Sequence, residues 1–429
     1  MLVEFRVKNY RSIRDELSLS MLKAPIKGLE QSNTFSPYKD KKDISLLRSA
    51  TIYGPNASGK SNILKALSTM QELVLASHQK YQRGDKLPAE PFLLDAQTRN
   101  APTEFEIFFT EQGVQYQYGM AITSDTVEEE WLYAYPKRQS QKWFHRVKDQ
   151  WSFGSNFRGN KKLWSESTRP NTLFLSTAIS MNSQMLQPVY DWFKTKLHIL
   201  ANSKEYWHPS FTYSLCEEEK QKKRVVEFLK VADMDIDDIV IDERPFDPDN
   251  DIPDDLPEPL KKEISDDLKN RKLKSAYSIH TDLQGERIRF KIDKHESDGT
   301  KKFISFIGPW LDTLEHGYVL VIDELHDNFH PMMVRFLIQL FHNSQINKKN
   351  AQLIFTSHET SVLSQDIFRR DQIWFCSKKS KSTQLYSLVE FKPRKDVTDI
   401  EKAYLSGRYD ALPFLKTPYE IFEDQEDES

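Results

Sequence analysis

Apolar and polar residues alternate in two stretches near the start of the chain. Residues 2–7 and 17–21 place every second side chain on an apolar face, which is typical of half-exposed strands. Residues 46–53 form a more continuous apolar run that enters a glycine-rich turn, and beyond the turn apolar residues recur at near-helical spacing from 62 to 77. The pattern predicts two strands and then a strand–turn–helix unit.

The pattern changes several times in the middle of the chain. Residues 105–135 contain three alternating runs separated by polar turns, which predict β-strands, and the basic and aromatic residues 136–171 are expected to continue that sheet. Residues 172–232 have helical spacing. Residues 233–272 carry acidic runs and five prolines between Pro245 and Pro259, and are expected to form an irregular, solvated loop followed by a short helix.

The glycine-rich turn reads GPNASGKS and matches the phosphate-loop pattern GxxxxGK[ST] in full. In such a loop, backbone N–H groups converge on a β-phosphate, and the positive end of the following helix points to the same place. We expect Lys60 to reach the β- and γ-phosphates and the hydroxyl of Ser61 to ligate Mg²⁺. The predicted nucleotide-binding residues are Gly54, Asn56, Ala57, Ser58, Gly59, Lys60, Ser61 and Asn62.

Two carboxylates follow an apolar run later in the chain. Residues 319–322 are all apolar, which predicts a parallel strand buried on both faces, and Asp323 and Glu324 come directly after it. Ligands of open α/β sheets bind at the carboxyl ends of the strands. Asp323 is therefore expected to hold Mg²⁺ and Glu324 to polarise an attacking water. The alternative, a core strand that happens to end in surface acids, becomes the less favoured one once the phosphate loop is taken into account.

A third strand is predicted at residues 353–358, which read LIFTSH. Its last residue, His358, would lie beside Lys60 and Asp323 if all three strands belong to one parallel sheet. Spacing alone leaves two interpretations open: His358 has a purely structural role, or it senses the γ-phosphate.

Composition restricts the cellular compartment and the kinds of binding partner that we expect for this protein. The formal net charge is −4, so any contact with nucleic acid would depend on a local basic patch, for which residues 136–148 and 158–164 are the candidates. A solvated sheet face is the favoured interpretation of both. The two cysteines, Cys216 and Cys376, are far apart and fit a reducing compartment. The sequence shows neither a signal peptide nor a membrane span, so we expect a cytoplasmic location without membrane contact.

The order of these motifs resembles the ABC-type ATPases, in particular their RecF, SMC, Rad50 and OLD-like branch. VKNYRSI at residues 7–13 looks like the opening strand of that branch, and ESDGT at residues 296–300 resembles its signature segment. The resemblance implies ATP and Mg²⁺ as ligands, Arg11 and Ser12 near the nucleotide, and His358 as the switch histidine. It also implies that Ser297, Gly299 and Thr300 contact the γ-phosphate held by an opposite subunit.

The resemblance is closest to bacterial AbiLi/RloA-like anti-phage ATPases, through PFLLD (91–95), EEEWLYAYP (128–136), NTLFLSTA (171–178) and YLSGRYDALP (404–413). It implies an α/β fold, an ABC-type ATPase head with a mixed or parallel core sheet, an antiparallel β subdomain and a helical insertion. The expected parts are residues 1–95 and 276–415 for the head, 96–171 for the β subdomain, 172–275 for the insertion and 416–429 for an acidic tail.

The resemblance also implies a function. We expect an ATPase whose composite site forms in a homodimer or higher homo-oligomer, and which regulates a separately encoded toxin or nuclease during abortive infection. Two alternatives remain open from the sequence: a RecF-like DNA-repair ATPase, and a scaffold that binds ATP without turnover.

Overall fold

The structure is a computed structural model that describes residues 1–38, 44–136, 139–200, 209–248, 252, 256–268, 272–327, 329–391 and 399–413. The chain divides into two compact units, the first formed by residues 1–202 and 313–429 and the second by residues 203–312. The predicted acidic tail, residues 416–429, and residues 249–251 and 253–255 of the predicted acidic loop lie outside the described residues.

A six-stranded sheet forms the core of the first unit, in the order β11-β15-β16-β5-β17-β18. The first five strands are parallel, and β18 is antiparallel to β17. Their bounds are Leu197–Leu200 (β11), Val319–Ile322 (β15), Gln352–Thr356 (β16), Ser49–Tyr53 (β5), Ile373–Lys379 (β17) and Ser382–Ser387 (β18). This mixed sheet confirms the expected α/β fold class, including the buried parallel strand before Asp323.

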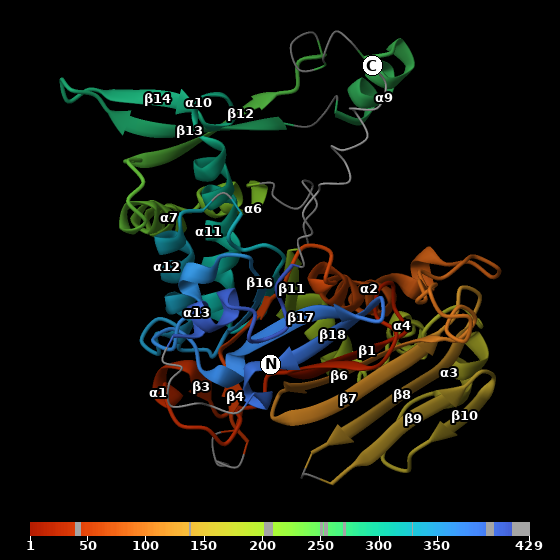
Figure 1. Cartoon of the computed structure of the whole chain (residues 1–429). Helices are drawn as coiled ribbons and strands as arrows, with labels where there is room; N and C mark the ends of the chain where they lie inside the picture. The colour runs from red at the N-terminus through yellow and green to blue at the C-terminus, as the bar shows by residue number, and fades with distance from the viewer. Residues whose placement is uncertain are drawn as a thin grey trace, which may run out of the picture. The chain divides into compact units, whose positions relative to one another are not determined.

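An antiparallel sheet of seven strands forms the other layer of this unit, in the order β10-β9-β8-β7-β6-β1-β2. Figure 1 shows its strands β6 to β10 side by side, in orange and yellow. The bounds are Gln150–Phe153 (β10), Gln141–Val147 (β9), Val127–Tyr135 (β8), Val114–Ile122 (β7), Thr103–Glu111 (β6), Leu2–Lys8 (β1) and Leu17–Ser20 (β2). The predicted strands at 2–7, 17–21 and 105–135 are thereby confirmed.

Helix α2 (Lys60–Lys80) packs in the hydrophobic cluster that both sheets share. Its buried residues recur every three or four positions, and they include Ile63, Leu67 and Met70. The same cluster contains Phe5 and Phe105 from the antiparallel sheet, and Ile52 and Val321 from the core sheet. Since burial on this scale is the main favourable contribution to folding, α2 is fixed between the two layers, and with it the position of Lys60.

The other helices of the first unit have at most 12 residues. They are α1 (Glu30–Asn33), α3 (Lys161–Ser167), α4 (Phe174–Ser180), α5 (Gln187–Asp191), the π-helix η1 (Trp192–Lys196), α12 (Pro331–His342) and α13 (Ile400–Leu405), with a small sheet of β3 (Thr34–Phe35) and β4 (Leu46–Leu47). Two predictions need correction here. Residues 136–171 do not continue the sheet throughout, because α3 follows β10. Residues 172–232 are not purely helical, because β11 is the edge strand of the core sheet.

The second unit contains a three-stranded antiparallel sheet as well as helices. The sheet is β12 (Asp238–Pro245), β13 (Lys272–Thr281) and β14 (Arg287–Lys291). The helices are α6 (Ser210–Leu215), α7 (Glu219–Val231), α9 (Glu258–Leu268), α10 (Ile292–His295) and α11 (Asp298–His316). The short helix predicted after the acidic residues is confirmed as α9. The expectation of an irregular loop from residue 233 is wrong at β12, whose charged residues pair with β13 and whose Ile239 is buried.

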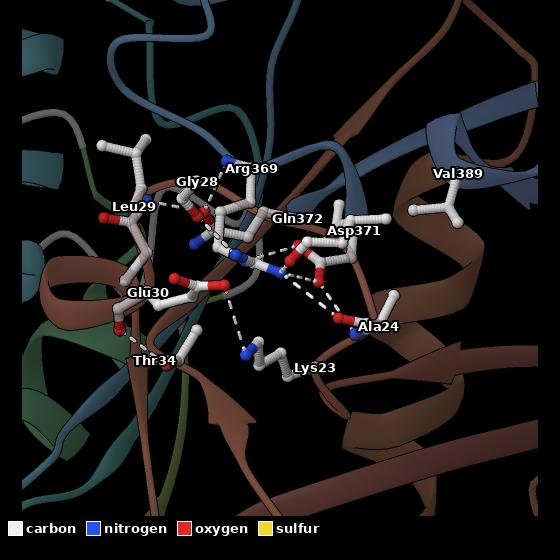
Figure 2. Close-up of polar contacts among 12 residues, drawn as sticks. Lys23, Ala24, Gly28, Leu29, Glu30, Thr34, Arg369, Asp371, Gln372 and Val389 are labelled. Atoms are coloured by element: carbon white, nitrogen blue, oxygen red, sulfur yellow. Dashed lines mark hydrogen bonds and ion pairs between the residues drawn. The ribbon is translucent and has the colours of Figure 1, made fainter. Parts of the chain in front are cut away.

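A buried arginine ties an N-terminal loop of the first unit to its C-terminal part (Figure 2). The guanidinium of Arg369 makes two hydrogen bonds to the carboxylate of Asp371, at 3.0 and 2.7 Å, and both side chains are at most 4% exposed. It also donates to the carbonyls of Gly28 and Ile26, while the backbone N–H of Ala24 donates to Asp371 at 2.8 Å. The pair is therefore fully hydrogen-bonded, which a buried charge requires.

Replacing Arg369 with Ala should lower the free energy of unfolding by about 3–5 kcal/mol, because Asp371 is left as an uncompensated buried charge. Thermal and urea unfolding measure the loss. The matched control is Lys162→Ala, which breaks an ion pair with Glu166 whose side chains are 86% and 64% exposed. That change should cost less than about 1 kcal/mol. Equal effects of the two substitutions would contradict the role given to Arg369.

Candidate functional site

The phosphate loop occupies the space between the end of β5 and the start of α2, which is the context that the motif requires. Its two glycines lie where no side chain fits. A Cβ at Gly54 would come within 2.1 Å of the carbonyl oxygen of Cys376 in β17, and one at Gly59 within 2.1 Å of the hydroxyl of Thr383 in β18. Gly59 also has a φ of 110°, in the region that favours glycine. The two glycines thus let the loop pack directly against the β17–β18 hairpin.

Lys60 lies at the first position of α2 with its ammonium turned back onto the loop. It donates to the carbonyls of Gly54 at 2.8 Å and Pro55 at 3.1 Å. Burial lowers the pKa of Lys60, and the nearby charges of Asp323 and Glu324 act in the opposite direction. The backbone of Ala57 has a φ of 59°, and a left-handed residue of this kind is part of the backbone nests that bind anions.

One threonine organises the two carboxylates after β15. The hydroxyl of Thr356, the last residue of β16, donates to Asp323 at 2.6 Å and accepts the backbone N–H of Glu324 at 2.7 Å. Asp323 is almost fully buried, whereas Glu324 is half-buried and lines a cavity. Glu324 also has a φ of 53°, an uncommon backbone conformation for a side chain other than glycine, asparagine or aspartate. The chain therefore turns sharply at Glu324, and such a turn re-aims the side chain away from the strand.

His358 follows β16 by two residues and lies on the same cavity. Its backbone N–H donates to Nδ1 of His326 at 3.4 Å, and the two imidazole rings meet edge to face with centroids 5.5 Å apart. Burial, together with the neighbouring Lys60 and His326, lowers the pKa of His358 to about 4, and the charge of Asp323 acts in the opposite direction. The imidazole is therefore neutral at physiological pH, and one of its nitrogens carries a hydrogen that it can donate.

The cavity has a volume of about 300 Å³. It brings together most of the residues predicted from the sequence, and one that was not predicted, Lys378 of β17. Its lining residues are Ser12, Asn56, Ala57, Ser58, Gly59, Lys60, Ser61, Asn62, Glu324, His358 and Lys378. Gly54 and Asp323 do not line it.

Arg11 does not line the cavity either. Its guanidinium forms an ion pair with Glu90 at 2.7 Å, and its backbone N–H donates to the carbonyl of Glu90 at 2.6 Å. The neighbouring Ser12 does line the cavity and accepts a hydrogen bond from the side chain of Asn62 at 2.7 Å. The structure therefore gives Arg11 a partner away from the cavity wall.

The residues expected to form the signature segment, Ser297, Gly299 and Thr300, belong to the second unit, at the start of α11. The hydroxyl of Ser297 accepts the backbone N–H of Thr300 at 3.1 Å and lies 2.9 Å from the hydroxyl of Thr300. Ser297 is exposed, and Gly299 and Thr300 are partly exposed. The hydroxyl of Ser297 thus satisfies one of the free N–H groups at the start of this helix.

Several basic side chains of residues 136–148 are paired with other groups of the protein. Arg146 is buried and donates to the carbonyls of Lys148 and Thr172, each at 2.8 Å. His145 lies 2.6 Å from Glu129, and Lys148 lies 3.4 Å from Glu128. Lys137 and Arg138 lie outside the described residues. Among the described residues, this stretch therefore offers little free positive charge for a nucleic-acid backbone.

The donor atoms of the site suit Mg²⁺. Among the described residues, no three His, Cys, Asp or Glu side chains lie close enough to hold a metal by themselves. Ser61 and Asp323 supply a hydroxyl and a carboxylate, both hard oxygen ligands. Mg²⁺ is usually bound by one or two such protein ligands together with water and substrate phosphates. The residues present fit that arrangement.

We compared the chain with curated protein sequences and with solved structures. No curated protein sequence matches this chain. The SMC head domain from Thermotoga maritima is 12% identical, with a TM-score of 0.40, and the match covers 90% of this chain and 98% of that one. An Smc head domain with a coiled coil and joint derived from Pyrococcus yayanosii is 11% identical, with a TM-score of 0.34 and coverage of 90% and 96%.

In the described part of the chain, no helix is both long enough and apolar enough to pass through a membrane.

Residues 49–364, more than half of the chain, match the family described as "AAA domain, putative AbiEii toxin, Type IV TA system". That range begins at β5 and ends after His358, so it contains the phosphate loop, both carboxylates and the histidine. The chain belongs to this family of AAA-domain proteins.

Proposed function

We propose that this protein binds Mg²⁺-ATP and hydrolyses it to ADP and phosphate. The observation that carries the proposal is the convergence of three strand ends on one cavity: Lys60 follows β5, Glu324 follows β15 and His358 follows β16. These are the parts that phosphoryl transfer needs, namely a phosphate cradle, a cation, and a carboxylate placed to orient the nucleophile.

Each residue has a distinct task in this proposal. The backbone N–H groups of the loop and the ammonium of Lys60 bind the β- and γ-phosphates, so Lys60 exchanges its carbonyl partners for phosphate oxygens. Ser61 and Asp323 would hold Mg²⁺, and the bound cation would supply positive charge to the phosphates. Glu324 accepts a hydrogen bond from the attacking water and orients it. His358, being neutral, donates its ring N–H to the γ-phosphate.

The signature residues give the proposal its second part, a composite site between two copies of the chain. Ser297, Gly299 and Thr300 are at least partly exposed, and their sequence resembles the signature segment of ABC-type ATPases. In the proposed dimer, these residues of one copy complete the shell around the γ-phosphate held by the other. ATP then binds the closed dimer more tightly than ADP does, and this difference in affinity drives a switch.

The biological role that we propose is regulatory. The sequence resembles AbiLi/RloA-like ATPases over most of its length, and the description of its family names a toxin of a Type IV toxin–antitoxin system. We infer that the ATP-dependent switch controls a separately encoded effector during phage infection. The described residues contain no cluster of acidic residues or histidines that would hold the metal of a nuclease. Stimulation of turnover by DNA, without any partner protein, would instead favour the DNA-repair alternative.

Replacing Lys60 with Ala should weaken ATP binding by about 10- to 100-fold, because charge-assisted hydrogen bonds to the phosphates are lost. Glu324→Gln should leave binding nearly unchanged and lower kcat by about 10²- to 10⁴-fold. Calorimetric titration and phosphate release measure the two effects. Lys65→Ala, on the exposed face of α2, is the control and should behave as the unaltered protein. Full turnover by the Glu324→Gln variant would exclude the role of Glu324.

The Glu324→Gln variant should also form a stable dimer with Mg²⁺-ATP, since it holds ATP without hydrolysing it. Size-exclusion chromatography with light scattering should show a twofold mass with ATP and the smaller species with ADP. Adding Ser297→Arg should abolish the dimer while each copy still binds ATP, whereas Lys294→Ala, an exposed control in α10, should leave the dimer intact. A Glu324→Gln variant whose mass is the same with and without ATP would disprove the composite site.

A further inference from the structure

The β17–β18 hairpin (blue in Figure 1) supplies one lining residue of the cavity, Lys378, that the nucleotide motifs do not explain. Lys378 of β17 and Thr383 of β18 are directly opposite each other in the antiparallel register. Residues paired in this way point to the same face of a sheet. Cys376 lies on that face too, two residues before Lys378, and its thiol donates to the carbonyl of Ser58 in the phosphate loop. This face of the hairpin is therefore turned toward the loop.

Thr383 fixes the hairpin to the phosphate loop through a chain of hydrogen bonds. In this chain, the donor and the acceptor of each bond can be assigned. Its hydroxyl donates to the carbonyl of Ser58 at 2.8 Å. That bond uses its single hydrogen, so the hydroxyl of Ser12, 2.8 Å away, donates to Thr383. Ser12 accepts in turn from the side chain of Asn62, and the backbone N–H of Thr383 donates to the carbonyl of Ser12 at 2.8 Å. The hairpin is thus held in place by three segments that surround the cavity.

Lys378 is the cation that this hairpin presents to the cavity. It is exposed, it lines the cavity together with the phosphate loop, and its ammonium forms no ion pair or hydrogen bond with any described residue. Its neighbour Lys379 points to the opposite face of the strand. A lysine without a carboxylate partner, at the rim of a polar cavity that already holds Lys60, favours a ligand with several negative charges.

The strand order shows which part of such a ligand Lys378 reaches. In the core sheet, β16 and β15 lie on one side of β5, and they carry His358 and Glu324. β17, which carries Lys378, lies on the other side of β5. The γ-phosphate belongs on the side of Glu324, because the attacking water must lie beside it. The opposite side of the loop is then left for the end of the phosphate chain that joins the ribose.

We propose that the ammonium of Lys378 binds the α-phosphate of the nucleotide, an inference that rests on the ATPase function proposed above. Because ADP and ATP share the α-phosphate, Lys378 contributes to the affinity for both by a similar factor. It holds the nucleotide in the site without discriminating between the two states of the switch. His358, which the proposed function places at the γ-phosphate alone, would instead favour ATP over ADP.

Titration calorimetry of Lys378→Met with Mg²⁺-ADP and with a non-hydrolysable ATP analogue tests the inference. The Kd of each nucleotide should rise by about 10-fold, since one charge-assisted hydrogen bond at an exposed site is lost. In steady-state turnover, KM should rise by a similar factor while kcat at saturating ATP stays within about twofold. Lys378→Arg should retain most of the affinity. Lys379→Met is the matched control on the opposite face and should bind as the unaltered protein.

The outcomes separate this inference from the proposed function. If the unaltered protein binds neither nucleotide, the proposed function is wrong and this inference fails with it. If the unaltered protein binds and Lys378→Met binds equally well, the inference alone is wrong. A loss of affinity for the ATP analogue but not for ADP, with a fall in kcat, would place Lys378 at the γ-phosphate and also overturn it. Unchanged melting temperatures show that the variants are folded.

Discussion

The parallel pairing of β15, β16, β5 and β17 is the constraint on which the site depends. Ile322 pairs with Phe355 and Thr356 pairs with Ile52, so β15, β16 and β5 end almost level with one another. Each of β5, β15 and β16 is buried along its whole length, so a shift in register would disturb core packing as well as hydrogen bonds. The residues that follow the strands are thereby gathered at one edge of the sheet, although they come from distant parts of the sequence.

Buried polar side chains make the same connections between the N- and C-terminal parts of the first unit. Gln352 accepts the backbone N–H of Leu2 and donates to the carbonyls of Leu2 and Leu47, and Gln372 donates to the carbonyl of Ser49. Next to the cavity, Thr356 bonds the turn after β15, and Thr383 bonds the phosphate loop and Ser12. Such groups are costly to bury unless every partner is in place, so they favour a single arrangement of the segments that carry the site.

The sequence was sufficient to predict the local structure around the phosphate loop and around the two carboxylates. The phosphate loop and the carboxylates after β15 are short motifs, and their chemistry depends on neighbours in the chain. β11 was missed because four residues carry no readable period, and it is a strand only because β15 pairs with it. β12 was missed because most of its residues are charged or exposed. Lys378 and Thr383 belong to no nucleotide motif; Thr383 meets Ser12 across 371 residues, and no pattern within either segment indicates that contact. The apolar run that ends in Lys378 and Lys379 was the one available signal.

The discontinuity of the first unit has a consequence for how the protein is made. β5 and its phosphate loop leave the ribosome well before the two strands that flank β5, and the hydrogen bond of Ser49 with Gln372 joins residues 323 positions apart. Until then the nascent chain exposes an apolar strand with two open edges, a surface prone to aggregation. In the proposed function, the nucleotide site is therefore complete only after β16 and β17 have been synthesised and have paired with β5.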